Sequence, residues 1–291
     1  MSDAISRPGR VHEVTSTANP IVKDIRRLAQ KRHREETGLF LCEGLKLARD
    51  AQAAGWPIAT LIYPKESKGD GPIAALATRT VASGGDVLEV SRKVLATILR
   101  RENPAFVAAV VRRRAVALAD IRAAGEDVWV ALDRVRDPGN LGTVIRTADA
   151  VGAAGVILVG ETVDPFGLEA VRATMGSLFA VPLARASEDE FIAWRAAWPG
   201  RVVGTHLEGA VDYRTIDYSG APQLVVMGNE QRGLSDRLAA ACDHLALIPQ
   251  APRGAAVDGT VGAGGADSLN LAVATGVMLF EVRRHALGSG T

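Results

Sequence analysis

Three loops in the C-terminal half of the sequence carry the residues best suited to chemistry. Each combines glycine, which lets a ligand approach the backbone, with asparagine, glutamate, serine or arginine, which can hydrogen-bond a ligand. Each also follows an apolar run typical of a buried parallel strand. Because ligands bind at the carboxyl ends of the strands in an open α/β sheet, the loops predict one shared site. They are residues 133–149, 227–235 and 248–270.

These loops do not match the usual nucleotide-binding or hydrolase motifs. The second loop lacks the lysine of a P-loop, and the glycine-rich run at 259–266 follows no strand and lacks GxGxxG spacing with a downstream acid. The sequence also has no GxSxG or HExxH motif and no carboxylate pair at a recognisable spacing. The site therefore requires another kind of ligand chemistry.

The segment after the third loop is expected to form a helix. Small and apolar residues recur at i, i+3, i+4 and i+7, and Asp267 or Ser268 is placed to cap the first turn. The residues around Thr275 are mostly small, so another backbone or a ligand could approach this helix closely. An ordinary C-terminal helix behind a flexible loop is the alternative. The residues at this spacing are Leu269, Ala272, Val273, Gly276 and Phe280, and the small residues expected on the buried side are Ala272, Ala274, Thr275 and Gly276.

Length and composition indicate a globular protein. The 291 residues favour two domains, and 47% hydrophobic with 23% charged residues are enough for a core but too polar for a membrane protein. No apolar run approaches the roughly 18 residues of a spanning helix, and the N-terminus lacks a signal-peptide core, so a cytoplasmic location without membrane partners is expected. Cys42 and Cys242 have neither a CxxC partner nor a nearby histidine pair, which predicts reduced, buried thiols and no metal site.

Basic residues are concentrated in the first 115 positions although the net charge is only +1. Such a concentration can form a phosphate-binding surface on a nearly neutral protein. The alternative is that they lie on solvated helix faces with acidic partners. One group is Lys23, Arg26, Arg27, Lys31, Arg32 and Arg34, and the other is Arg92, Lys93, Arg100, Arg101, Arg112, Arg113 and Arg114.

Alternating strand and helix patterns divide the chain into two α/β parts. Residues 1–15 are expected to be a disordered lead, residues 16–113 a smaller N-terminal α/β domain, and residues 114–126 a linker rich in Ala and Arg. Residues 127–291 contain continuous apolar strands separated by helices, which predicts a parallel sheet with helices on both faces. Ser235 is expected to cap one of these helices.

The three loops together resemble the three motifs of the SpoU family of RNA 2′-O-ribose methyltransferases, in the SPOUT superfamily. The first motif matches at residues 137–153, the second at 225–235, and the third at 248–249 followed by 268–276. The resemblance implies a catalytic domain with a deep trefoil knot, S-adenosyl-L-methionine as cofactor, and a homodimer whose site is shared between subunits. More loosely, residues 15–44 resemble the RNA substrate-binding domain of many family members.

The resemblance also implies the catalytic residues. Arg146 resembles the catalytic arginine, which acts as the base or, since a guanidinium has a pKa above about 12, orients the ribose hydroxyl and an adjacent phosphate. Asn140 contacts RNA or caps its helix, and Glu230 holds Arg146 or a loop amide, or is a surface acid. Ser268 caps the last helix or belongs to the active site. The implied set is Asn140, Arg146, Glu230, Ser268 and Asn270.

For the cofactor, the resemblance implies contacts from the second and third motifs. Gly228 is expected to be glycine because a side chain there would obstruct a ligand lying against the loop. Thr205, at the end of a predicted strand, is a further candidate. The implied cofactor residues are Gly228, Asn229, Gly233, Ile248 and Leu269, with Thr205.

Two features depart from the family pattern. Residues 250–267 separate the two parts of the third motif, where the family has only a few residues, and this loop is expected to be flexible or to close over the cofactor. In the N-terminal domain, residues 103–106 read NPAF in place of an NPQG-like segment. The resemblance therefore supports no RNA contact at that segment.

The leading hypothesis is methylation of a ribose 2′-hydroxyl in ribosomal RNA, because a separate N-terminal domain suits recognition of a folded RNA loop. Transfer RNA is the second candidate substrate. An RNA-binding or ribosome assembly factor without activity is the alternative from another class, but all the implied catalytic residues are present. A Rossmann-type enzyme that uses NAD is the remaining rival.

Overall fold

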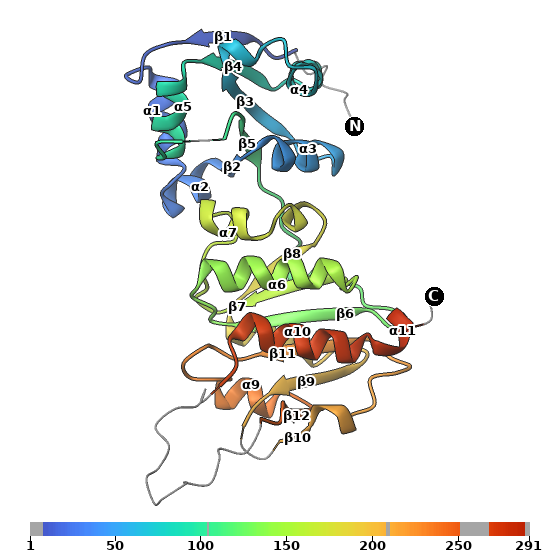
Figure 1. Cartoon of the computed structure of the whole chain (residues 1–291). Helices are drawn as coiled ribbons and strands as arrows, with labels where there is room; N and C mark the ends of the chain where they lie inside the picture. The colour runs from blue at the N-terminus through green and yellow to red at the C-terminus, as the bar shows by residue number, and fades with distance from the viewer. Residues whose placement is uncertain (1–7, 104, 208–209, 251–267, 289–291) are drawn as a thin grey trace, which may run out of the picture. The chain divides into compact units, whose positions relative to one another are not determined.

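The chain forms two compact units (Figure 1). The computed structural model describes residues 8–103, 105–207, 210–250 and 268–288. The N-terminal unit comprises Met1–Arg114 and Asp164–Ala180, and the C-terminal unit comprises Ala115–Val163 and Val181–Thr291. The segment Asp164–Ala180 thus belongs to the N-terminal unit, although the sequence predicted one continuous domain over residues 127–291.

The N-terminal unit is built on a five-stranded sheet in the order β1-β4-β3-β5-β2. The strands β1, β4 and β3 run parallel, and β5 pairs antiparallel with β3 and β2. Leu61 and Ile62 of β3 are both fully buried although they point to opposite faces, so both faces of the sheet are covered. The strands are β1 Val11–Val14, β2 Leu39–Glu43, β3 Ile58–Pro64, β4 Asp86–Val90 and β5 Ala108–Arg112.

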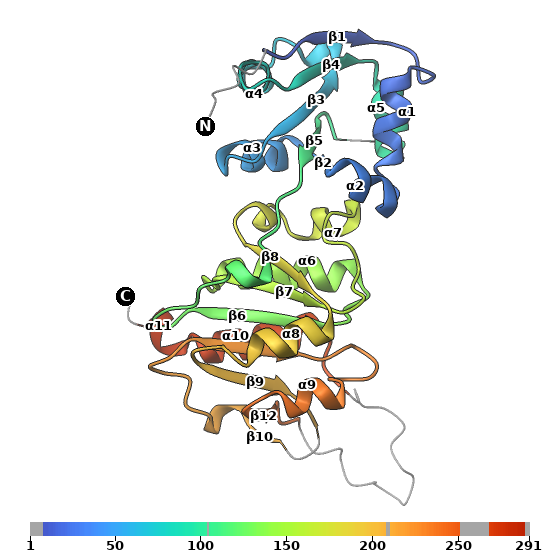
Figure 2. The ribbon, with the colours of Figure 1, turned by 180° about the vertical axis from the view of Figure 1, so that it is seen from behind.

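Helices cover this sheet on both faces (Figures 1 and 2). The helices α1 and α5 pack together on one face, where Ile25 and Ile98 enter the core, and α3 and α4 lie on the other. Helix α1 begins at an N-cap, because the Asn19 side chain accepts a hydrogen bond from the backbone N–H of Ile21 at 2.9 Å. The helices are α1 Pro20–Arg27, α2 Lys31–Thr37, α3 Leu45–Ala53, α4 Gly71–Ala82, α5 Arg92–Leu99 and α7 Leu168–Ala173.

Strand β1 lies within the segment for which the sequence predicted a disordered lead. It pairs with β4, Val14 is buried, and the backbone N–H of Arg10 donates to Asp86 Oδ1 at 2.9 Å. A four-residue edge strand with one buried side chain carries too little pattern to be recognised in a sequence. The prediction of a disordered lead is therefore wrong for Val11–Val14.

A buried ion pair and an aromatic cluster attach Asp164–Ala180 to the rest of the N-terminal unit. Arg34 Nη2 lies 2.7 Å from Asp164 Oδ2, and both side chains are buried. Ring centroids in the cluster are 5.0 to 6.5 Å apart, a separation at which aromatic pairs attract one another. The cluster consists of Phe40, Trp56, Phe166 and Phe179.

The C-terminal unit contains a seven-stranded sheet in the order β10-β12-β9-β11-β6-β7-β8, with every pairing parallel. The strands β6, β7 and β11 are buried along their whole length, as expected where helices cover both faces. The predicted α/β class with a parallel sheet is confirmed. The strands are β6 Val128–Asp133, β7 Gly155–Val159, β8 Leu183–Ala186, β9 Arg201–Thr205, β10 Val211–Asp212, β11 Gln223–Met227 and β12 His244–Leu247.

Helices α6 and α10 lie on one face of this sheet and α8 and α9 on the other (Figures 1 and 2). Phe191 of α8 and Leu238 of α9 join a core that includes Trp129 and Ile157, while α10 packs against α6 and β11. Over the described ranges, no helix combines the length and apolar character needed to cross a membrane. The helices are α6 Pro138–Ala150, α8 Glu188–Arg195, α9 Asp236–Ala240, α10 Leu271–Val282 and α11 Arg284–Gly288.

The stretch predicted as a linker, residues 114–126, is largely part of the C-terminal unit. The backbone N–H of Val116 donates to Leu183 O at 2.8 Å beside β8, and Ile121 is buried. A single bridge and one buried isoleucine produce no periodic pattern, so composition alone suggested a free connection.

Candidate active site

Four neighbouring strands end at the sheet edge from which the predicted loops begin. In the order β12-β9-β11-β6, their last residues are Leu247, Thr205, Met227 and Asp133. Parallel strands share one carboxyl edge, so the loops that follow these residues start side by side. The fold thereby brings together segments that are far apart in the sequence.

Side chains from all three loops meet in one hydrogen-bonded cluster. Asn140 Nδ2 donates to Glu230 Oε1 at 3.2 Å, and Asn270 Nδ2 donates to Asn140 Oδ1 at 2.9 Å. Asn140 lies in the first turn of α6, Glu230 in the turn after β11, and Asn270 directly before α10. The predicted convergence of the three loops is therefore present in the structure.

The helix caps in this cluster differ from those expected. Asp137, not Asn140, caps α6, because Asp137 Oδ1 accepts from the backbone N–H of Asn140 at 2.6 Å. Asn270 caps α10 by accepting from the backbone N–H of Ala272 at 2.9 Å and of Val273 at 3.3 Å. Ser268 is exposed and precedes the cap, while Asp267, the other expected cap, is outside the described residues.

Glu230 is held by side-chain amides, and Arg146 stands apart from it. Besides Asn140, Glu230 accepts from Asn229 Nδ2 at 3.3 Å. Arg146 lies on α6, six positions after Asn140, and is exposed. It has no hydrogen bond or ion pair among the described residues, so its guanidinium is available to an anionic ligand.

The second loop forms a tight turn closed by its own backbone. Asn229 and Gly233 exchange two backbone hydrogen bonds, at 3.0 and 2.9 Å, and Gly233 has a φ of +66°. A Cβ at Gly228 would lie 2.4 Å from the backbone of Gly233 and of Leu234. Gly228 is thus required by the turn itself, while the expectation that it also leaves space for a ligand stays a prediction.

Asp133 and Arg134 anchor this turn, although the sequence did not single them out. Arg134 pairs with Asp133 through two hydrogen bonds of 2.7 Å, which raise the pKa of the guanidinium, and the Asp133 side chain is buried. Arg134 adopts a φ of 48°, uncommon for a residue other than glycine, and its carbonyl accepts from Asn229 Nδ2 at 2.8 Å. The feature of the sequence that could have identified Asp133 is a charged residue at the end of an otherwise apolar strand.

Asp133 also reaches the residues after the turn. Asp133 Oδ2 accepts from the backbone N–H of Ser235 at 3.2 Å, and Ser235 Oγ donates to Glu188 Oε1 at 2.8 Å. Ser235 caps α9, since its Oγ accepts from the backbone N–H of Leu238 at 3.2 Å, which confirms that prediction. The turn is therefore fixed at both ends.

The residues implied for the cofactor lie around the same strand edge. Thr205 is half-buried at the end of β9, and among the described residues its hydroxyl donates a single long hydrogen bond, 3.5 Å to Val226 O. Ile248 directly follows β12 and is half-buried, and Leu269, next to Asn270, is 38% exposed. Exposed apolar side chains and a hydroxyl that can make a further hydrogen bond fit a ligand that has both a flat ring and polar groups, as S-adenosylmethionine has.

The fold and site define a class, the α/β enzymes that bind their ligand at the carboxyl edge of a parallel sheet. The side chains that the structure describes contain no group of three or more His, Cys, Asp or Glu arranged to hold a metal ion. Polar amides, one carboxylate and one free guanidinium suit the positioning of a polar substrate.

Comparisons with known proteins identify the family. Residues 127–280 match the SpoU rRNA Methylase family model, and residues 19–109 match the MRM3-like substrate binding domain. The chain belongs to the SpoU rRNA methylase family, and it is an S-adenosylmethionine-dependent RNA methyltransferase.

Individual relatives resemble the chain over nearly its whole length. A 23S rRNA (uridine(2479)-2′-O)-methyltransferase of Streptomyces viridochromogenes is 32% identical over 91% of this chain and 89% of the relative. The crystal structure of an AdoMet-bound rRNA methyltransferase from Sinorhizobium meliloti has 57% identity and a TM-score of 0.84, covering 94% of this chain and 98% of that one. The SpoU methyltransferase AviRb from Streptomyces viridochromogenes, in complex with AdoMet, has 31% identity and a TM-score of 0.80 over 92% and 98%.

Proposed function

We propose that the protein transfers a methyl group from S-adenosylmethionine to the 2′-hydroxyl of a ribose in ribosomal RNA. The observation that carries the proposal is the Asn140–Glu230–Asn270 cluster on the loops of a parallel sheet edge, with the unpaired guanidinium of Arg146 on the same helix as Asn140. The relatives named as 2′-O-methyltransferases of 23S rRNA support ribosomal RNA as the substrate.

The chain's own residues orient the reacting hydroxyl. S-adenosylmethionine, when bound, supplies a methyl group whose carbon–sulfur bond breaks as the ribose oxygen forms its new bond. The guanidinium of Arg146 donates hydrogen bonds and accepts none, so it orients the hydroxyl and an adjacent phosphate and stabilises the oxygen as its proton leaves to water. Glu230 holds Asn140 and Asn229, and Asn270 adds the third loop. Ser268, exposed beside Asn270, offers a further hydroxyl to the substrate.

The cofactor is expected at the edge formed by β12, β9 and β11. Ile248 and Leu269 provide apolar surface for the adenine ring, and Thr205 provides a hydroxyl. The turn closed by Asn229 and Gly233 provides backbone groups. Gly228 contributes by allowing that turn to form.

The active form is proposed to be a homodimer built on α10. Two residues of the predicted apolar stripe on α10 are exposed: Val273 is 54% and Phe280 53% exposed. The helix packs on its own unit through Leu271, Ala272, Thr275, Met278, Leu279 and Val282, which include Ala272 and Thr275 of the predicted small buried side. The stripe of Leu269, Val273 and Phe280, with Gly276 between them, is an apolar face that a second copy of the chain would cover.

Two further properties follow from the family and are proposed here. The last long helix, α10, is expected to be part of the trefoil knot, since it packs against both α6 and β11. Tracing residues 248–270 in an experimental structure tests this.

The protein is proposed to act in the cytoplasm on RNA bound by its N-terminal unit, in which residues 19–109 match a substrate-binding domain model. Cell fractionation tests the location.

The test of the function is a methyl-transfer assay with radiolabelled S-adenosylmethionine and total RNA from cells that lack the protein. We expect label in ribosomal RNA at a position resistant to alkaline hydrolysis, because a 2′-O-methyl group blocks attack on the adjacent phosphate. Label only in transfer RNA would change the substrate. Absence of label from both fractions, with the cofactor still bound, would identify an RNA-binding or assembly factor instead.

A further inference from the structure

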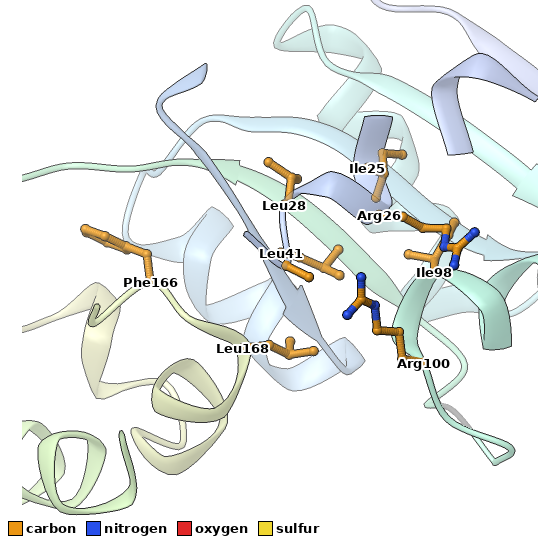
Figure 3. A pocket seen from close by; sticks show the side chains of 9 residues that line it. Ile25, Arg26, Leu28, Leu41, Ile98, Arg100, Phe166 and Leu168 are labelled. Carbon is orange, nitrogen blue, oxygen red and sulfur yellow. The ribbon is translucent and has the colours of Figure 1, made fainter. Parts of the chain in front are cut away.

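Two arginines of the N-terminal unit flank a small apolar hollow between α1 and α5. The hollow has a volume of about 20 Å³. Figure 3 shows the Arg26 and Arg100 side chains beside Ile98. Space for about one water molecule cannot enclose a nucleobase, but a ring could lie over its mouth against the apolar side chains. The lining residues are Ile25, Arg26, Leu28, Ala29, Leu41, Ile98, Arg100, Phe166 and Leu168.

The guanidinium groups at this hollow are not used by the fold. Within the described ranges, neither Arg26 nor Arg100 makes a side-chain hydrogen bond or ion pair. Other arginines of the unit do, since Arg34 pairs with Asp164 and Arg172 with Glu43. Two unpaired cations over an apolar floor suit a ligand with a flat apolar face and a negative charge, which is the chemistry of a nucleotide.

The backbone holds Arg100 in an unusual conformation. Arg100 ends α5 with a φ of 53°, a position normally taken by glycine or asparagine. The strain is tolerated although glycine would remove it. Among the described residues no hydrogen bond or ion pair uses the guanidinium at this position, so it is available to a ligand.

A second feature lies along the same side of α5. Arg92 and Ala96 are spaced at i and i+4 on one side of this helix, and Arg100 follows its last turn as the C-cap, about 12 Å from Arg92 along the axis. The guanidinium of Arg92, which also bonds Glu66, lies 5.0 Å from the ring centroid of Phe106. Phe106 is 54% exposed, an arrangement that offers a base a stacking surface.

We infer that this side of α5 binds a short unpaired stretch of the RNA substrate. Arg26 and Arg100 bind phosphates around the hollow, and Phe106 with Arg92 stacks a neighbouring base; we call these residues the α5 strip. The inference rests on the proposed function for the identity of the RNA. It assigns a base contact to Phe106, in a segment where the family resemblance supports no inference about RNA contacts.

Direct binding of a short, unstructured, fluorescent oligoribonucleotide to the full chain tests the inference. One variant combines Arg26→Ala with Arg100→Gly, in which glycine keeps the left-handed backbone at position 100. The other variant is Phe106→Ala. We expect each to weaken binding about 10-fold. The double variant should also reduce the slope of log affinity against log salt by about 1.4, since each lost phosphate contact to a single strand contributes about 0.7.

The matched control is Arg79→Ala, which removes an exposed, unpaired arginine from α4 on the other face of the sheet. We expect nearly unchanged binding, with circular dichroism showing that all variants are folded. Wild-type binding by the strip variants would overturn the inference, as would an equal loss for a duplex of the same sequence. Methyl transfer by the wild type is measured in parallel, so failure of the proposed function is recognised separately.

Discussion

The side-chain amide of Asn270 donates to Oδ1 of Asn140 at 2.9 Å, while Oδ1 of Asn270 caps its own helix. One residue therefore both starts α10 and ties it to the first turn of α6. Because the amide is used at both ends, a carboxylate could not replace it, since it has no donor, and a serine hydroxyl is on a shorter side chain that cannot also reach Asn140.

We expect Asn270→Ser to separate these two roles. Serine caps helices about as well as asparagine, so stability should stay near that of the wild type, whereas Asn270→Ala should lose about 1 kcal/mol of unfolding free energy. Both variants lose the donor to Asn140, and methyl transfer should fall in both. Full activity in Asn270→Ser would show that the bond is not used in catalysis.

Arg146→Ala should lower turnover by at least about 100-fold, because a donor that stabilises charge in the transition state is lost. Stability should change by no more than about 0.5 kcal/mol, since the side chain is exposed and unpaired. The rise in Tm on adding S-adenosylmethionine should remain. Arg146→Lys should recover only part of the activity, because a lysine lacks the planar fork. Equal loss of cofactor binding and turnover would contradict this role.

Gly228→Ala should destabilise the protein by about 1–3 kcal/mol, because its methyl group would lie 2.4 Å from backbone atoms of Gly233 and Leu234. Urea denaturation measures the loss, and cofactor affinity should fall with it because the turn is displaced. Gly69→Ala is the control, since a Cβ there meets nothing within 4 Å. Similar stabilities of the two variants would refute the steric argument.

Charges on the exposed face of α10 should separate the proposed dimer. Val273→Glu combined with Phe280→Glu places two carboxylates in an apolar interface, so light scattering should change from the mass of a dimer to that of a monomer. Leu207→Glu, at a residue of the same unit that is 71% exposed, should leave the dimer intact. A monomeric wild type at micromolar concentration would rule the interface out.

Both thiols should be inert in the folded protein. Burial raises the pKa of Cys42 and of Cys242 to about 12, so at pH 8 about one thiol in ten thousand is ionised. A thiol-specific reagent should modify neither cysteine until denaturant is added. The pKa of each thiol is higher in the folded protein than the ordinary value of 9.0. The contribution of the neutral buried thiols to the free energy of unfolding is therefore complete below pH 9 and is lost as the pH rises towards 12. Rapid labelling of native protein would contradict the burial.

The convergence of the site could be predicted from the sequence, but the pairing within it could not. Apolar runs ending in Asp133, Met227 and Leu247 indicate buried parallel strands, and such strands share a carboxyl edge. Glu230 was expected to hold Arg146 or a loop amide, yet it accepts from the side-chain amides of Asn140 and Asn229. Which donor reaches a carboxylate depends on fractions of an ångström, which spacing along a chain does not encode.

The orientation of α10 was also beyond the sequence. Apolar residues occupy nearly all sides of this helix, because Met278 and Leu279 are buried while Val273 and Phe280 are exposed. Periodicity identifies a helix by contrast between an apolar and a polar side, and here that contrast is missing. Of the predicted helix residues, Ala272 and Thr275 are buried as expected, whereas Val273 and Phe280 of the predicted stripe are exposed.

The N-terminal unit is formed by two separate stretches of the chain, and this limits how domains can be exchanged between related proteins. A fragment ending at Arg114 would leave Phe40 and Trp56 without Phe166 and Phe179, and Arg34 buried without its counter-ion. A chimaera that exchanges RNA preference between relatives must therefore exchange Asp164–Ala180 together with the first part of the chain. Substitutions in one stretch of the N-terminal unit are therefore expected to require matching substitutions in the other, although part of the C-terminal unit separates the two stretches in the sequence.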